Sequence, residues 1–135
     1  MSNLNKLALL LVGSPRGILA ADESTRTMNL RLETNGVKSS NENRKAWRDL
    51  VFSTKGLSDF VSGIIMYKET LTEVVNSNRI LDMLSLSGII IGVKVDEGLE
   101  QIHTSPKESY TTGIDGLKKR LKLYKELGAK FTKWR

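Results

Sequence analysis

The sequence contains no cysteine and only one histidine, His103. Without thiolates the chain can form neither a disulfide framework nor a cysteine-ligated zinc site. A single histidine also excludes the His-rich zinc sites of hydrolases and metal-dependent lyases. We therefore expect no metal site and no cofactor in these 135 residues, so any chemistry must come from other side chains.

Aromatic residues are scarce as well, at 6% of the chain, and they do not interleave with the basic residues. A stacking platform for single-stranded nucleic acid is therefore poorly supported. The net charge of +6 still favours an anionic partner: nucleic acid, an anionic membrane surface or a phosphorylated metabolite. The densest basic cluster, at residues 118–122, fits the solvated face of an amphipathic helix, so we expect no nucleic-acid partner.

Long hydrophobic runs are also missing. The apolar segment Leu7–Val12 is far too short to span a bilayer, and no small-residue cleavage site follows it. Its spacing fits a core-facing helix. We therefore expect a cytoplasmic protein without a membrane partner.

Short apolar runs alternate with helical patterns along the chain, as in a parallel α/β sheet. No linker or repeat divides the sequence, so we expect one domain over residues 1–135. The expected strands are Gly17–Asp22, Val61–Tyr67, Gly88–Asp96 and Ala129–Trp134. One expected helix is opened by a capping box at Ser39–Glu42 and ended by Gly56, and it carries Ala46, Trp47, Leu50 and Val51 on one face. Further helices are expected at Leu71–Val75 and Ile80–Leu86, and along a stripe of Ile114, Leu117, Leu121, Tyr124 and Leu127.

An open, doubly wound sheet is the main alternative architecture. Such a sheet usually carries a glycine-rich phosphate-binding turn after its first strand. Here residues 22–28, which follow the first expected strand, contain no glycine. The dinucleotide-binding interpretation is therefore disfavoured.

Three of the expected strands begin apolar and end with charge on one face. Side chains alternate across a strand, so Lys94 and Asp96 share a face, as do Lys133 and Arg135, while Asp22 ends the first strand. For any single residue, a lysine reaching solvent or an aspartate capping a helix is the better explanation. Repetition in three strands argues against coincidence, and (β/α)₈ barrels place their active sites at the carboxyl ends of strands. Convergence of these groups predicts an anion pocket with a carboxylate available for proton transfer.

Six stretches, in order, resemble signature segments of class I fructose-bisphosphate aldolase. They are Gly17–Thr25, Asn41–Arg44, Ser62–Leu71, Gly92–Gly98, Thr111–Leu117 and Ala129–Arg135. The resemblance implies a (β/α)₈ (TIM) barrel and the reversible cleavage of fructose 1,6-bisphosphate to dihydroxyacetone phosphate and glyceraldehyde 3-phosphate, in glycolysis and gluconeogenesis. It also implies a Schiff-base lysine and no metal.

The resemblance also assigns site residues. Asp22, Lys133 and Lys94 match catalytic positions: the carboxylate near the C4 hydroxyl, the lysine that stabilises charge during cleavage, and a substrate-contacting lysine. The matches to hydroxyl- or phosphate-binding positions are Ser24, Thr27, Arg31, Arg44 and Arg135. Some positions depart from the family pattern: Arg26 replaces a glycine, and Leu30 and Glu97 replace lysines. Lys107, Ser109 and Tyr110 alter the stretch before Thr111.

The resemblance places the Schiff-base lysine and the glutamate proton acceptor in later strands of the barrel. We therefore expect this chain to be the amino-terminal half of a single barrel domain, truncated after strand four and inactive by itself. The complete protein would be a homotetramer acting on fructose 1,6-bisphosphate or fructose 1-phosphate. Two alternatives are another Schiff-base aldolase of the same fold and a non-enzymatic half-barrel that binds anions.

Overall fold

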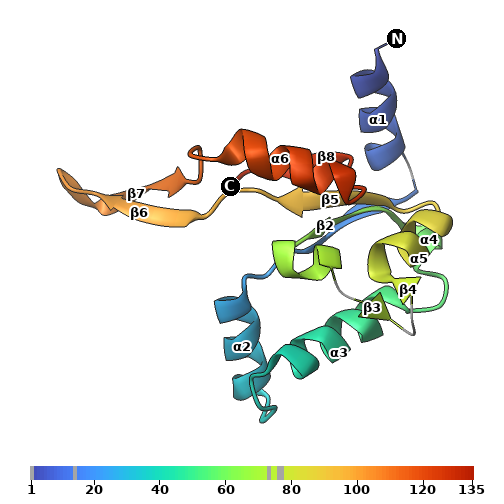
Figure 1. Ribbon diagram of the computed structural model, residues 1–135, viewed down its shortest axis with the longest axis horizontal. Helices are drawn as coiled ribbons and strands as arrows, with labels where there is room; N and C mark the ends of the chain where they lie inside the picture. Colours follow the sequence, from blue (N-terminus) through green and yellow to red (C-terminus); the bar gives the residue numbers. More distant parts are fainter. Residues whose placement is uncertain (1, 14, 73, 76–77) are drawn as a thin grey trace.

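The computed structural model describes residues 2–13, 15–72, 74–75 and 78–135. Its central sheet contains four parallel strands in the order β1-β2-β5-β8 (Figure 1). These strands are β1 (Gly17–Ala21), β2 (Val61–Met66), β5 (Ile90–Lys94) and β8 (Phe131–Lys133), and each lies inside a segment expected to be a strand. The spatial order follows the chain order, so each connection returns the chain to the neighbouring position in the sheet. In the described part of the chain β1 and β8 do not pair with each other, and the sheet is open.

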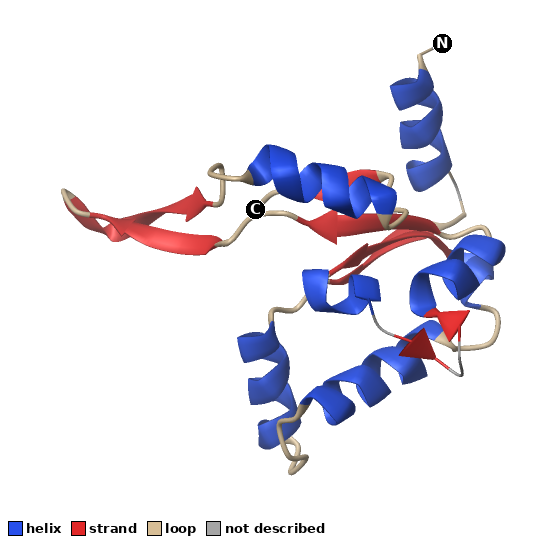
Figure 2. Cartoon of the chain, in the orientation of Figure 1, coloured by secondary structure: helices blue, strands red, loops and turns tan. Residues whose placement is uncertain are grey.

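Helices connect these strands, and two small antiparallel pairs of strands lie outside the central sheet. The helices are α1 (Asn3–Val12), α2 (Thr25–Thr34), α3 (Asn41–Phe52), α4 (Leu57–Phe60), the 3-10 helix η1 (Lys68–Thr72), α5 (Ile80–Leu86) and α6 (Leu117–Glu126). The strand pairs are β3 (Val74–Val75) with β4 (Asn78–Arg79), and β6 (Gly98–Ile102) with β7 (Ser105–Thr112). The hairpin β6–β7 extends away from the rest of the chain (Figure 2). Across the described ranges, none of the helices combines the length and the apolar character that crossing a membrane requires.

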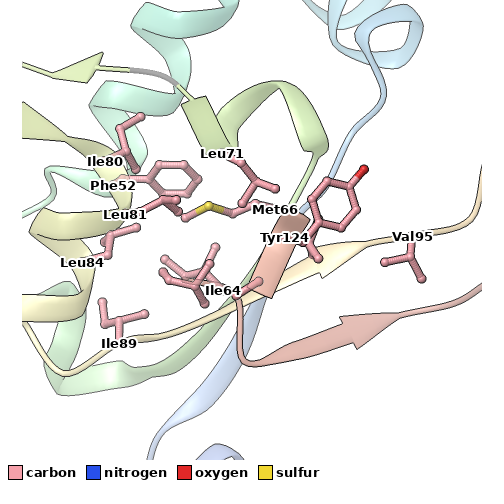
Figure 3. Packing of buried hydrophobic residues seen from close by; sticks show 13 residues of the cluster. Phe52, Ile64, Met66, Leu71, Ile80, Leu81, Leu84, Ile89, Val95 and Tyr124 are labelled. Atoms are coloured by element: carbon pink, nitrogen blue, oxygen red, sulfur yellow. The ribbon is translucent and has the colours of Figure 1, made fainter. Parts of the chain in front are cut away.

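One face of the sheet carries the hydrophobic core (Figure 3). Ile89, Ile91, Val93 and Val95 are at most 4% exposed, which confirms the predicted apolar face of the third strand. They pack with side chains from β2, α3, α5 and α6. Burial of this kind stabilises a sheet by about 25 cal/mol for each Å² of apolar surface removed from water. This face therefore anchors the helices to the strands.

The opposite face is built around glycine. A Cβ at Gly92 would lie 2.3–2.6 Å from ring atoms of Phe131, and one at Gly63 would lie 2.5 Å from Cδ2 of Leu11. The absence of side chains at these two glycines allows the Phe131 ring and helix α1 to lie directly against the backbones of β2 and β5. This packing fixes Phe131, which lies two residues before Lys133 on β8.

Two helix predictions need correction. The helix expected over Leu71–Val75 is wrong, because the chain there completes η1 at Thr72 and then forms strand β3 at Val74–Val75. Helix α3 ends at Phe52, and Gly56 instead precedes α4 with a φ of 79°. The cap of α3 is Ser40, one residue later than the capping box predicted.

The apolar face predicted for α3 is turned inward only at Val51, which packs against the core. Trp47 and Leu50 are 47% and 66% exposed, whereas Arg44, Arg48 and Phe52 are buried. The helix is oriented so that Arg44 and Arg48 both reach one half-buried carboxylate. In the stripe predicted around α6, Tyr124 is buried as expected, but Ile114 precedes the helix and is 69% exposed.

That carboxylate belongs to Glu69 on η1, whose side chain is 20% exposed. Arg44 Nη2 lies 2.7 Å from Glu69 Oε1, and Arg48 Nη1 lies 2.7 Å from Glu69 Oε2. The hydrogen bond from Arg44, helped by that from Arg48, outweighs the effect of burial and lowers the pKa of Glu69 from 4.5 to about 2. Helix α3 is therefore fastened to the segment that follows β2.

The lowered pKa of Glu69 makes stability depend on acid. The Glu69 carboxylate stabilises the fold fully above pH 4.5, and this contribution is lost as the pH falls towards about 2. We expect Glu69→Gln to lower the free energy of unfolding at neutral pH by on the order of 3 kcal/mol and to flatten the acid dependence. Urea unfolding between pH 6 and 2 measures both effects. The control Glu108→Gln, at an exposed position on β7, should shift stability by less than about 0.5 kcal/mol, and equal behaviour of the two variants would contradict the assignment.

The contact between Gly92 and Phe131 gives a second prediction. We expect Gly92→Ala to lower the free energy of unfolding by about 1–3 kcal/mol, because the new methyl group overlaps the ring and must displace it. Gly17→Ala is the matched control, since a Cβ at this glycine of β1 would meet no atom within 4 Å. Urea unfolding of the two variants should separate them, and a similar loss in both would rule out the overlap as the cause.

Candidate active site

An open hollow lies at the carboxyl ends of β1, β5 and β8. The three residues predicted to be catalytic, Asp22, Lys94 and Lys133, all line it. Parallel strands end at the same edge of a sheet, and the alternation of side chains turns these three groups to the same side. The predicted binding residues Ser24, Thr27, Arg31 and Arg135 line the same hollow.

Asp22 and Lys133 form an ion pair across the hollow. Lys133 Nζ donates a hydrogen bond of 2.7 Å to Asp22 Oδ2. The two residues are 111 positions apart in sequence and come from the first and last strands of the sheet, which β2 and β5 separate. Strands three positions apart in a flat sheet would lie roughly 14 Å from each other. The contact therefore draws on the length of the lysine side chain and on curvature of the sheet towards the hollow.

A second charged group forms at the ends of β5 and β8. Lys94 Nζ lies 2.6 Å from Asp96 Oδ2, and Arg135 Nη2 lies 3.6 Å from the same oxygen. The side chain of Asp96 is 0% exposed. Burial raises the pKa of Asp96, but the hydrogen bond and charge of Lys94, together with the charge of Arg135, outweigh it and lower the net pKa. The sequence placed Asp96 on the face of Lys94 but assigned it no role, and the two-residue spacing was the signal available.

The first turn of α2 forms another wall of the hollow. Ser24 caps the helix: its Oγ accepts a hydrogen bond from the backbone nitrogen of Thr27 at 3.3 Å and lies 3.1 Å from the Thr27 hydroxyl. Arg31, about one helical turn after Thr27, pairs with Glu23. The free backbone N–H groups and the dipole at a helix N-terminus attract anions. The side chain of Arg26, exposed and lining the hollow, adds a positive charge beside this turn.

The hollow is more basic than acidic. Among the described residues that line it, seven are lysine or arginine and five are aspartate or glutamate. Most of these cations already have a carboxylate partner, so their side chains are oriented before any ligand arrives. Such a site can bind a phosphate group and stabilise a developing oxyanion, while Asp22 can accept a proton.

Arg44 is the one predicted site residue that the structure places elsewhere among the described residues. Its guanidinium pairs with Glu69 and donates a hydrogen bond of 2.9 Å to Asn29 Oδ1, and it does not line the hollow. Asn29 does line the hollow, so Arg44 lies behind it. His103 lies at the exposed turn between β6 and β7. The part of the chain that the structure describes contains no group of three or more His, Cys, Asp or Glu side chains that could hold a metal ion.

Known proteins are similar to this chain in sequence and in fold. The sequence profile of the family described as fructose-bisphosphate aldolase class-I matches residues 3–135. Fructose-bisphosphate aldolase 1 of Toxoplasma gondii is 49% identical over 121 residues, which are 89% of this chain and 33% of that protein. Cytosolic fructose-bisphosphate aldolase 4 of Arabidopsis thaliana is 43% identical over 126 residues, which are 92% of this chain and 32% of that protein.

A solved structure extends the similarity to three dimensions. The fructose-bisphosphate aldolase of Plasmodium falciparum, crystallised in complex with TRAP and a small-molecule inhibitor, superposes with a TM-score of 0.94 at 44% identity. The match covers 98% of this chain and 38% of that one. The chain thus spans about a third of the length of the curated relatives it matches. Because the family profile and the solved structure each align with nearly the whole chain, the chain belongs to the class-I fructose-bisphosphate aldolase family.

Proposed function

We propose that residues 1–135 form one half of a (β/α)₈ barrel and carry part of the active site of a class I fructose-bisphosphate aldolase. The reaction is the reversible cleavage of fructose 1,6-bisphosphate to dihydroxyacetone phosphate and glyceraldehyde 3-phosphate. The observation that carries this proposal is the convergence of Asp22, Lys94 and Lys133 from three parallel strands on one basic hollow. Family membership then selects this reaction among those that such a hollow could support.

Two features support the barrel. The strands follow one another in the sheet in chain order, as barrel strands do, and each crossover runs through helical structure. The ion pair between Asp22 and Lys133 joins the ends of the outermost strands, which requires the sheet to bend towards the hollow. Four further strands would continue that curvature and pair with the free edges of β1 and β8.

The geometry suggests what each group does with a sugar phosphate. Cleavage of the C3–C4 bond removes the proton of the C4 hydroxyl as the carbonyl forms, and Asp22 is the carboxylate available to accept it. Lys133 orients the carboxylate of Asp22 before the reaction and stabilises negative charge on the substrate oxygens during it. Lys94, Arg135 and the first turn of α2 bind the anionic end of the substrate.

By the resemblance, the lysine that forms the Schiff base comes from a later strand than these four. The electron pair released from the C3–C4 bond is delocalised into that Schiff base, so residues 1–135 supply binding and proton transfer but not the electron sink. We further propose that the complete protein is a cytoplasmic homotetramer without a cofactor. The cytosolic location named for the Arabidopsis relative supports the first of these points.

The proposed absence of the Schiff-base lysine from residues 1–135 can be tested directly. We expect the 135-residue chain to bind fructose 1,6-bisphosphate without cleaving it, because the nucleophile is not among its residues. A coupled assay for triose phosphate formation should stay at background, and borohydride should trap no adduct with dihydroxyacetone phosphate. Turnover, or a covalent adduct located by mass spectrometry, would overturn this assignment.

The binding half of the proposal rests on Lys133. We expect Lys133→Met to weaken the binding of fructose 1,6-bisphosphate by about tenfold, through the loss of one charged hydrogen bond. Calorimetric or NMR titration measures the change. Lys118→Met is the matched control, since this exposed lysine of α6 does not line the hollow. Equal weakening in both variants would reduce binding to general charge attraction and contradict a specific site.

A further inference from the structure

The hollow contains one acid with no exposed surface. The side chain of Asp96 is 0% exposed, compared with 11% for Asp22, 17% for Glu23 and 46% for Glu97, the other hollow acids that pair with a cation. One of its oxygens, Oδ2, faces both Lys94 and Arg135. The other, Oδ1, is buried and has no hydrogen-bond partner in the described part of the chain. Asp96 therefore cannot present its carboxylate to a ligand in the hollow.

The backbone around Asp96 is held on several sides. Just beyond the last paired residues of β5 and β8, the nitrogen of Val95 donates a 3.0 Å hydrogen bond to the carbonyl of Lys133. The hydroxyl of Thr111 on β7 donates a 2.7 Å bond to the carbonyl of Arg135, and Arg120 of α6 donates to the carbonyl of Val95 at 3.3 Å. The strand ends that carry Lys94, Asp96 and Arg135 are thus fixed to each other, to the hairpin and to α6.

The burial of the Asp96 carboxylate carries a free-energy cost that its surroundings must offset. Burial of an ionised carboxylate costs several kcal/mol and is tolerated only with close counter-charges. Two cations near one another at the edge of a hollow have the opposite difficulty, because they repel and their long side chains spread into solvent. A shared carboxylate beneath them removes both costs. The neighbouring charges are already matched elsewhere: Lys133 pairs with Asp22, and Arg120 with Glu97 at 3.5 Å.

We propose that Asp96 is a positioning residue, whose buried carboxylate holds the ammonium of Lys94 and the guanidinium of Arg135 together as one anion-binding clamp. The carboxylate is 0% exposed, whereas the side chains of Lys94 and Arg135 are 12% and 52% exposed, so a phosphate group meets the two cations without displacing the carboxylate. The clamp retains one net positive charge, and both of its arms are ordered before the ligand arrives. The identity of that ligand as a sugar phosphate rests on the proposed function, whereas the ordering of the two cations does not.

The ligand-free chain tests the ordering. Asp96→Asn keeps the shape and removes the charge, and NMR relaxation of the side-chain nitrogens reports the motion of Lys94 and Arg135. We expect both groups to become mobile in Asp96→Asn while Lys133 stays ordered. The matched substitution Asp22→Asn should do the reverse, releasing Lys133 and leaving Lys94 and Arg135 in place. Unchanged order of Lys94 and Arg135 in Asp96→Asn would overturn the proposal.

Ligand binding tests whether the ordering matters. Titration with fructose 1,6-bisphosphate is compared for the unaltered chain, Asp96→Asn, Lys94→Met and the double variant. We expect Asp96→Asn to weaken binding about tenfold in the unaltered background and less than about twofold when Lys94 is already absent. A general structural role would cost the same in both backgrounds. Equal or tighter binding by Asp96→Asn, as expected if the carboxylate merely competes with the ligand, would overturn the proposal.

Two controls keep the outcomes separate. Backbone amide spectra of each variant establish that the fold is retained, and Asp96→Ser, which is neutral and smaller, carries the same expectations should asparagine not be accommodated. If the unaltered chain does not bind the sugar phosphate, the proposed function fails. The relaxation measurement on Lys94 and Arg135 still decides the positioning role of Asp96.

Discussion

The ion pair between Asp22 and Lys133 is the contact on which the arrangement of the charged residues depends. It joins the carboxyl ends of the first and last strands of the sheet at 2.7 Å, although the residues are 111 positions apart in sequence. The sheet must curve for these ends to meet, and that curvature encloses the hollow. The same pair orients the carboxylate of Asp22 and directs the side chain of Lys133 towards it. The Asp22–Lys133 ion pair therefore constrains both the curvature of the sheet and the orientation of the charged side chains.

The two faces of the sheet have different roles: one carries the hydrophobic core and the other leads to the charged hollow. On one face the branched side chains of β5 and the apolar side chains of α3, α5 and α6 form the core, which provides the rigid support. On the other, Gly63 and Gly92 leave room for Phe131, and charged groups follow at the strand ends. Cations in the hollow are mostly matched to carboxylates at the outset. A ligand therefore meets oriented side chains, which lowers the entropy cost of binding.

Much of this could be predicted from the sequence because strands obey a simple alternation. Four strands, the apolar face of β5 and the shared placement of Asp22, Lys94, Lys133 and Arg135 all followed from it. Predictions failed where burial depends on a distant partner. The apolar stripe on α3 is turned inward only at Val51, whereas Arg44 and Arg48 are buried, since Glu69 lies on a segment more than twenty residues away in the chain. The hairpin β6–β7 was not foreseen, because its mostly exposed residues follow no clear hydrophobic period.

The sequence by itself determined the family, the parallel order of elements and the list of charged residues that end the strands. These follow from local patterns and from motifs that need no knowledge of contacts. Only the tertiary structure decided which charges meet. It paired Lys133 with Asp22 and Arg44 with Glu69, and it buried the Asp96 carboxylate next to the charged groups of Lys94 and Arg135. The physical reason is that an ion pair depends on distance and burial, and both are properties of how remote segments pack rather than of any one segment.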